Sequence, residues 1–249
     1  MTMPLPELWD DELRDYRQRY QLPDQWLWDE AAWARVQFDG YMRLILDLLP
    51  PPPAEVLDVG CGPGFGAKHM AARGYAVTGL DFNERGIAFG RILVPEARLF
   101  HADARLLPQH EELHGRFEAV TIIEVLEHIP PEFHDDVMRG AWAALQPGGV
   151  LVVSVPSNQL TPSRWDYKHF ELREVTELME RHGFGLNATV FQCRMGPVKW
   201  PKLWQLVDNR FYDLKVLRRL LRKAFLRRYN IASSEGSAGR FIVRGVKPA

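Results

Sequence analysis

A glycine-rich loop in the first third of the sequence has the composition of a ligand-binding turn. Residues 58–66 read DVGCGPGFG and directly follow a short run of strand-forming residues. Glycines allow a tight turn and let the backbone approach a ligand closely. Because Gly62, Gly64 and Ala67 also satisfy the G-x-G-x-x-A pattern of dinucleotide-binding loops, a nicotinamide cofactor is one interpretation of this loop.

Three acidic residues favour a different ligand. Asp58 ends the strand before the loop, where its carboxylate would repel a pyrophosphate and attract an ammonium group. Asp81 ends the second predicted strand and can accept hydrogen bonds from both hydroxyls of a ribose. Asp103 follows the third strand, where it can accept from an adenine amine while Ala104 offers its N–H. With no arginine fork beside them, these acids predict a cationic adenosine ligand without phosphate; helix capping by Asp81 and Asp103 is the structural alternative.

Ionisable side chains after the fourth predicted strand are candidates for the reaction itself. Residues 124–129 read EVLEHI, and the carboxyl ends of parallel strands form the usual ligand crevice. His128 is the best general base, because imidazole titrates near neutrality and an attacking hydroxyl must lose its proton. His169, in the aromatic run 165–170, is a second base or an orienting group. The alternatives are a capping role for His128 and simple loop packing for His169.

The elements that position these residues follow from the alternation of short strand-like runs with helix-length amphipathic stretches, which is typical of βαβ units. The predicted strands are 55–59, 75–80, 97–101, 117–124, 150–155, 186–193 and 240–246. Residues 1–49 form a predicted N-terminal helical cap, with a helix from Asp29 to about Leu49. Its four tryptophans suit a lid or simple packing on the sheet. The main domain is predicted over residues 50–249, with a basic helical insertion at 194–239.

Together these motifs resemble those of the class I S-adenosylmethionine-dependent methyltransferases, over residues 50–193 and the last strand. The matching features are the glycine loop, Asp81, the Asp103-Ala104 pair, the segment 124–129 and the LQPGG run at 145–149. The resemblance implies an α/β, Rossmann-like, doubly wound fold with a seven-stranded, mostly parallel sheet whose last strand is antiparallel. It also implies S-adenosyl-L-methionine as the cofactor.

The same resemblance assigns roles to individual residues. Asp58 and Gly60 would lie at the methionine moiety, Asp81 at the ribose, Asp103 and Ala104 at the adenine, and Ile123 and Glu124 along the cofactor. The full predicted cofactor site is Asp58, Gly60, Cys61, Gly62, Gly64, Asp81, Phe82, Asp103, Ala104, Ile123 and Glu124, and the predicted catalytic residues are His128 and His169.

A divalent metal is a further possibility that the predicted site leaves out. On a helix, Glu124, Glu127 and His128 would share one face and could hold an ion together with His169. The spacing resembles the metal-dependent branch of the family, which includes ubiquinone-biosynthesis O-methyltransferases and small-RNA 2′-O-methyltransferases. The chain departs from the RNA enzymes at Lys168, where those have a further histidine, and the same string is common in relatives without metal.

Composition restricts the setting of the protein. Lys plus Arg number 31 against 32 Asp plus Glu, so no global field recruits nucleic acid. Cys61 and Cys193 cannot build a disulfide framework, no apolar run approaches the ~18 residues of a membrane span, and no secretory signal is recognisable. We therefore expect a cytoplasmic protein, peripheral at the inner face of the membrane if the insertion docks there.

The insertion concentrates positive charge. Residues 199–228 carry ten Lys or Arg and two Asp, and apolar residues recur at helical spacing over 211–228. This pattern fits docking on an anionic membrane surface or on an acidic acceptor, and equally a helix packed on the domain or on a partner subunit. RNA binding has the least support, because no nucleic-acid module is recognised.

The prediction for function is O-methylation of a hydroxyl on a small-molecule or membrane-associated acceptor. A sugar or lipid-carried glycan and then RNA are the alternative acceptors. A membrane- or partner-binding module that retains the cofactor fold is the alternative outside enzymes. A nicotinamide oxidoreductase is disfavoured by Asp58.

Overall fold

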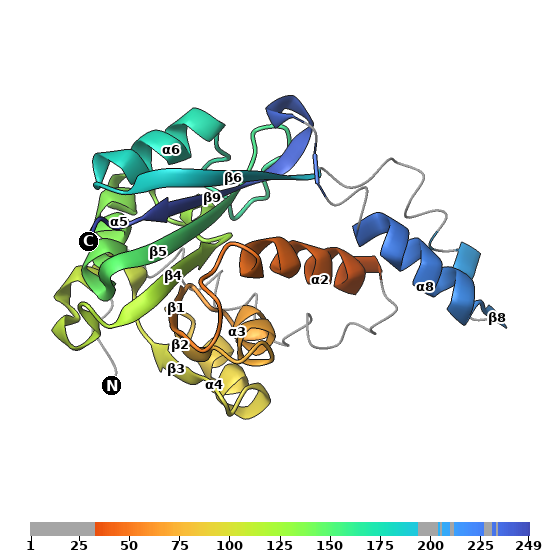
Figure 1. The fold of residues 1–249 in the computed structure, drawn as a ribbon, viewed down its shortest axis with the longest axis horizontal. Coiled ribbons are helices and arrows are strands. Elements are labelled where there is room, and N and C mark those ends of the chain that lie inside the picture. Colours follow the sequence, from red (N-terminus) through yellow and green to blue (C-terminus); the bar gives the residue numbers. More distant parts are fainter. Residues whose placement is uncertain (1–32, 194–203, 205, 210–211, 227–230, 233) are drawn as a thin grey trace.

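The computed structural model describes residues 33–193, 204, 206–209, 212–226, 231–232 and 234–249 (Figure 1). Its centre is a seven-stranded sheet in the order β3-β2-β1-β4-β5-β9-β6. The strands are β1 (Glu55–Val59), β2 (Ala76–Asp81), β3 (Arg98–His101), β4 (Phe117–Ile123), β5 (Leu145–Pro156), β6 (Gly185–Cys193) and β9 (Ala238–Val246). Strand β9 is antiparallel to both of its neighbours, β5 and β6, whereas the other pairs are parallel. The predicted fold class is confirmed.

The order of the strands creates the site. The chain leaves β1 towards β2 and β3, then returns to add β4 and β5 on the other side of β1. Two crossovers therefore diverge beside β1, and in such sheets the ligand crevice lies there, beyond the carboxyl ends of the strands. The loops after β1, β2, β3 and β4, which carry most of the predicted site residues, are brought together at this edge.

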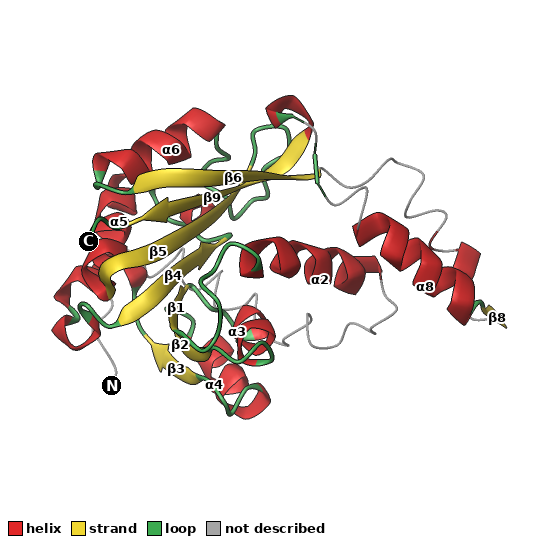
Figure 2. Cartoon of the chain, in the orientation of Figure 1, coloured by secondary structure: helices red, strands yellow, loops and turns green. Residues whose placement is uncertain are grey.

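Helices cover both faces of the sheet (Figure 2). They are α2 (Trp33–Leu46), α3 (Phe65–Ala71), α4 (Glu84–Leu93), α5 (His134–Ala144) and α6 (Leu172–Arg181). Alternate residues of a strand point to opposite faces, so Val56 joins the apolar cluster with α2, α3 and α4, and Leu57 joins the cluster with α5 and α6. Short 3-10 helices, such as Ala104–Gln109, complete the second face.

Two predicted segments are described only in part. The helix predicted from Asp29 to Leu49 is present as α2, whereas residues 1–32 lie outside the described residues, so the cap over 1–49 remains a prediction. The helix predicted within the insertion is present as α8 (Lys215–Ala224), preceded by the two-residue strands β7 (Asp208–Asn209) and β8 (Tyr212–Asp213). No helix in the described part of the chain is long and apolar enough to cross a bilayer.

Candidate functional site

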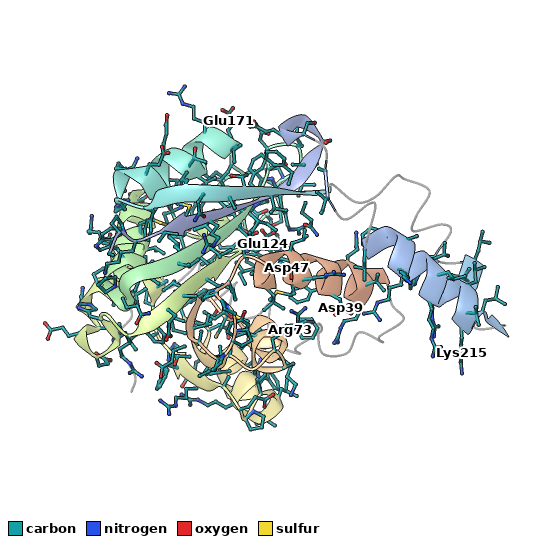
Figure 3. The ribbon with its side chains drawn as sticks, viewed as in Figure 1. Asp39, Asp47, Arg73, Glu124, Glu171 and Lys215 are labelled. Carbon is teal, nitrogen blue, oxygen red and sulfur yellow. The ribbon has the colours of Figure 1, made fainter. Side chains whose placement is uncertain are left out.

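A cavity of about 550 Å³ opens at the carboxyl ends of the central strands. Every predicted cofactor-binding and catalytic residue lines it except Gly64. Helix α2 contributes Phe38, Tyr41 and Met42 to its wall, and β9 contributes Arg240. Figure 3 shows Glu124 where α2 meets the ends of the central strands. The folded chain thus gathers residues that are up to two hundred positions apart in the sequence.

The glycine loop is held tightly against β2. The N–H groups of Gly60 and Cys61 both donate to the Leu80 carbonyl, at 2.8 and 2.9 Å. Gly60 has φ +74°, and an added Cβ would lie 2.4 Å from the Val125 side chain, so only glycine fits. Gly64, with φ +80°, begins α3 and shapes the loop without lining the cavity.

Asp58 is a buried carboxylate at the floor of the cavity. It accepts a hydrogen bond from the Thr121 hydroxyl at 2.7 Å, and Gly66 leaves room beside its other oxygen. Burial raises the pKa of Asp58 to about 7, against the lowering effect of the Thr121 hydrogen bond and with help from the charge of Asp81. A buried carboxyl with so little compensation is suited to a cationic ligand, which would favour its ionised form.

Asp81 links the glycine loop to the end of β2. Its oxygens accept from the N–H of Gly62 at 2.9 Å and of Asn83 at 2.7 Å. Burial raises the pKa of Asp81 to about 6, although both hydrogen bonds lower it. Asn83, and not Asp81, caps α4 through Gly86. Because each carboxylate oxygen can accept more than once, Asp81 keeps capacity for ligand hydroxyls.

Asp103 departs from its predicted surroundings. The sequence predicted no arginine fork beside the three acids, but Arg105 pairs with both oxygens of Asp103, and the two side chains are buried. The reason is local: Asp103 caps the 3-10 helix Ala104–Gln109, which turns Arg105 back onto it. Asp103 is thus a helix cap that also lines the cavity, and its role at the adenine stays a prediction. Arg105 neutralises the charge of Asp103, so Asp58 and Asp81 are the acids that give the glycine-loop end of the cavity its negative potential.

The remaining predicted cofactor residues, Cys61 and Phe82 among them, line the wall of the cavity. Cys61 is buried against Gly79, where an added Cβ would lie 2.8 Å from its sulfur, and burial raises the pKa of its thiol well above the usual range. The carbonyl of Phe82 accepts from His101 at 2.9 Å. Cys61 is therefore a filler of the loop and not a nucleophile.

The helical face predicted for a metal is not formed. Glu124 has a left-handed backbone with φ +53°, and only Leu126–His128 forms a single 3-10 turn. Glu124 instead accepts from Arg240 Nε at 2.7 Å and from Ser154 Oγ at 3.1 Å. Among the described residues no three His, Cys, Asp or Glu side chains are grouped so that they could hold a metal ion. The prediction that these side chains share one helical face is wrong, because the left-handed backbone of Glu124 prevents a continuous helix through it.

Asp166, which sequence reasoning did not single out, connects the two predicted catalytic histidines. Its Oδ1 lies 3.1 Å from His128 Nδ1 and its Oδ2 lies 3.1 Å from His169 Nε2. Burial alone would raise the pKa of Asp166, but hydrogen bonds from Ser163 and His169 and the charge of His128 outweigh it and lower that pKa. The D-x-x-H spacing before His169 was the available signal.

The protonation of the two histidines follows from their partners. His128 Nδ1 also lies 3.1 Å from the Trp165 carbonyl, which can only accept, so Nδ1 carries a hydrogen, and in the neutral imidazole the lone pair is on Nε2. Both nitrogens of His169 face acceptors, the Leu160 carbonyl at 3.0 Å and Asp166. His169 can therefore donate a hydrogen bond to Asp166 and orient it, whereas His128 is suited to accept a proton.

Glu127 is the other buried acid at this end. Burial raises its pKa well above the usual range, and the charge of Glu124 adds to the effect. Its Oε1 lies 3.9 Å from His128 Nε2, and its Oε2 has no hydrogen-bond partner within the described part of the chain. The raised pKa favours the protonated form of Glu127, so His128 is the better proton acceptor at this end of the cavity.

Tyr41 and Arg240 close the end of the cavity that holds Glu124 and His128, and sequence reasoning missed both. The Tyr41 hydroxyl is hydrogen-bonded to Ser154 and lies 3.3 Å from Glu124 Oε1. The Arg240 guanidinium lies 5.3 Å from the centre of the Tyr41 ring. A basic residue at the first position of the last predicted strand was the only sequence signal for this cluster. The cavity thus has an acidic end at the glycine loop and an end with His128 and Arg240.

The chain is similar to known proteins over most of its length. A family model described as a methyltransferase domain matches residues 33–224. The ubiquinone biosynthesis O-methyltransferase of Acinetobacter baumannii (strain ACICU) is 35% identical over 103 residues, which cover 40% of this chain and 43% of that protein. The enzyme of the same description from Pseudomonas paraeruginosa (strain DSM 24068 / PA7) is 37% identical over 101 residues, with the same coverage. The similarity spans about two-fifths of the length of these curated relatives.

Solved structures share the fold at low identity. A SAM-dependent methyltransferase from Archaeoglobus fulgidus superposes with a TM-score of 0.59 at 16% identity, covering 85% of this chain and 94% of that one. The 1,6-didemethyltoxoflavin-N1-methyltransferase of Burkholderia thailandensis, solved with S-adenosylhomocysteine, gives 0.55 at 17% identity, covering 100% and 94%. The [4+2]-cyclase SpnF gives 0.58 at 18% identity, covering 85% and 82%. Because a cyclase shares it, the fold alone does not fix the reaction.

Proposed function

We propose that this chain, which belongs to the class I S-adenosylmethionine-dependent methyltransferases, methylates an oxygen atom of a small-molecule or lipid-linked acceptor. S-Adenosyl-L-methionine is its methyl donor, and the cofactor supplies an electrophilic methyl group on a positively charged sulfur. The observation that carries the choice of oxygen is the His128-Asp166 pair in the acceptor end of the cavity. A hydroxyl needs a base when it attacks, and His128 is one.

The residues of the cavity fit this cofactor. Asp58 is a buried, poorly compensated carboxyl beside a glycine turn, which suits the ammonium group of the methionine moiety. Asp81 would take the ribose hydroxyls, and Asp103 with the N–H of Ala104 would border the adenine. Gly60, Cys61, Gly62, Phe82, Ile123 and Glu124 would form the remaining wall, while Gly64 shapes the loop.

The chemical contribution of the chain is alignment and proton removal. Bound S-adenosyl-L-methionine would supply the methyl group to the acceptor oxygen and would keep the electron pair of the broken carbon–sulfur bond on its sulfur. The chain would accelerate this transfer mainly by holding the acceptor and the cofactor in alignment. His128 Nε2 takes the hydroxyl proton, and Asp166 stabilises the resulting imidazolium. His169 holds Asp166 in place.

Replacing Asp81 by Ala should weaken binding of S-adenosylhomocysteine by about 1 to 3 kcal/mol, because the ribose loses its acceptor. The change also removes the acceptor of Gly62, so the loop is loosened. Isothermal calorimetry measures the affinity. Asp47→Ala is the matched control, since Asp47 lies just beyond α2 with its side chain 58% exposed (Figure 3). Equal affinities of wild type and Asp81→Ala would contradict the placement of the ribose.

The class of acceptor is found by incubating the purified chain and labelled cofactor with extracts of the native host. Mass spectrometry of the products then reports a methylated small molecule or lipid, a glycan or an RNA. If the label appears in a glycan or an RNA, that class replaces the proposed small-molecule or lipid-linked acceptor. The complete absence of label, with S-adenosylhomocysteine still bound, would favour a module that retains the cofactor fold without turnover.

A further inference from the structure

Helix α8 divides lengthwise into an apolar and a basic half. Successive residues of an α-helix are about 100° apart, which places one contiguous set of side chains on each half. The apolar set is Val216, Leu217, Leu220, Leu221 and Ala224, and the basic set is Lys215, Arg218, Arg219, Arg222 and Lys223. The helix contains no acidic residue.

One edge of the apolar half holds α8 on the protein. Phe225, just after the helix, packs with Val36 of α2 and with Trp204, and Leu221 lies against this cluster. On the adjacent basic edge, Arg222 donates to Asp39 of α2 at 2.8 Å. The prediction that the helix packs on the domain is therefore correct for this edge. Figure 1 shows α8 at the end of α2, away from the sheet.

The other edge of the apolar half is open to solvent. Val216 is 71% exposed, Leu217 44% and Leu220 59%. On the helical projection, exposed Arg219 and Lys223 border these three residues. We call these five residues the α8 strip. Exposed aliphatic side chains beside cations, on a helix anchored by its opposite edge, form a surface that suits a partner with both apolar and anionic character.

We propose that the α8 strip docks on an anionic lipid bilayer. The interface of such a bilayer offers phosphate groups to Arg219 and Lys223 and acyl chains to Val216 and Leu220, so one occupant satisfies both halves of the strip. A second copy of the chain is a poorer partner, because two α8 helices would oppose like charges. An RNA backbone would pair the cations but leave the aliphatic side chains in water.

Docking would also hold the chain, and with it the cavity, near the lipid surface. The helix that anchors α8, α2, provides Phe38, Tyr41 and Met42 to the cavity wall. An acceptor that partitions into the bilayer would then enter beside α2. This last step rests on the proposed function, whereas docking itself does not, because it involves no residue of the cofactor site.

The test is co-sedimentation of the full chain with phosphatidylglycerol–phosphatidylcholine vesicles and with pure phosphatidylcholine vesicles. We expect binding to the anionic vesicles only, weakened by added salt. Arg219→Glu/Lys223→Glu and Val216→Ser/Leu220→Ser should each lower the partition coefficient about ten-fold or more. Matched controls are Arg73→Glu/Arg85→Glu, both exposed, and Ile92→Ser on α4, where Ile92 is 76% exposed. Figure 3 labels Arg73 beside α3, away from Lys215 of α8.

S-Adenosylhomocysteine binding, measured on the same samples, reports the fold and the cofactor site independently of docking. Two results would overturn the proposal: no sedimentation with anionic vesicles at low salt, or equal losses in strip and control variants. Dimers that require Val216 and Leu220, formed without vesicle binding, would assign the strip to a second copy. RNA retention that requires Arg219 and Lys223, again without vesicle binding, would assign it to RNA.

Discussion

Replacing His128 by Ala should lower turnover about 10²-fold or more and leave the affinity for S-adenosylhomocysteine unchanged. Nε2 of His128 carries the lone pair, because Nδ1 is occupied as a donor by Trp165 and Asp166. Without it, the hydroxyl must lose its proton to water. Turnover is measured on the acceptor found in the extract experiment. The matched control is His182→Ala, a histidine at the end of α6 that lies beside Asp135, outside the cavity.

The same assay separates proton removal by His128 from metal-assisted catalysis that does not depend on His128. If His128→Ala keeps its activity, and if wild-type activity is lost with a chelator and restored by Mg²⁺ or Zn²⁺, a metal replaces the base. A rate that is indifferent to both treatments would remove both hypotheses. Loss of S-adenosylhomocysteine affinity in His128→Ala would show that the residue acts on the cofactor side.

Asp166→Asn tests whether Asp166 acts through His128. The substitution keeps the size of the side chain but removes the charge that stabilises an imidazolium, so we expect turnover to fall about ten-fold. The double variant should be no slower than His128→Ala alone, because Asp166 has nothing to support once the imidazole is gone. If the two substitutions act independently, their reductions in turnover should multiply in the double variant. That result would indicate that Asp166 only holds the loop that carries His169.

Local patterns predicted the glycine-loop half of the cavity, and long-range contacts decided the half that holds His128 and Arg240. The glycine loop, Asp58 and Asp81 are recognisable because each stands at a strand end, and the parallel topology brings such ends to one edge. Arg240 and Glu124 are 116 residues apart, and Tyr41 and Glu124 are 83 apart. No period or motif connects residues at such separations, so their pairing depends on the packing of β9 and α2.

Two sequence-based predictions were wrong because a rule of local structure was applied where the backbone does not have the assumed conformation. The i, i+3, i+4 spacing of Glu124, Glu127 and His128 predicts a shared face only on a continuous helix, and Glu124 has φ +53°. Likewise, Arg105 was not considered as a partner of Asp103, although a capping aspartate bends the following residues back towards itself. In both cases the backbone conformation of one residue decides which side chains meet.

Asp58→Asn should raise the melting temperature of the ligand-free protein at pH 8 while it weakens S-adenosylhomocysteine binding. Burial raises the pKa of Asp58 to about 7, from an ordinary value of 3.8. Between these two pH values the folded chain retains a proton that the unfolded chain has lost, so the free energy of unfolding falls as pH rises through this window. At pH 8 the ionised carboxylate costs about 2 to 4 kcal/mol of stability, which asparagine would not.

The expected gain in melting temperature is roughly 2 to 4 °C per kcal/mol for a chain of this size. This gain in melting temperature should disappear below about pH 4, where the Asp58 carboxyl is protonated in both the folded and the unfolded chain. With S-adenosylhomocysteine the order should reverse, because the ammonium group of the ligand pairs with the carboxylate and stabilises the wild type more strongly. For the same reason, wild-type affinity should increase as pH rises from 5 to 8 and Asp58 and Asp81 ionise.

Thermal melts at pH 4, 6 and 8, with and without S-adenosylhomocysteine, test both halves of this prediction. Asp47→Asn is the control for a change of charge alone, since that carboxylate is exposed to solvent. If Asp58→Asn melts below the wild type at pH 8 without ligand, the ionised carboxylate is satisfied by the protein itself, principally by Thr121. Asp58 would then be a structural residue of β1, and the proposed role of Asp58 in attracting a cation to the cavity would be wrong.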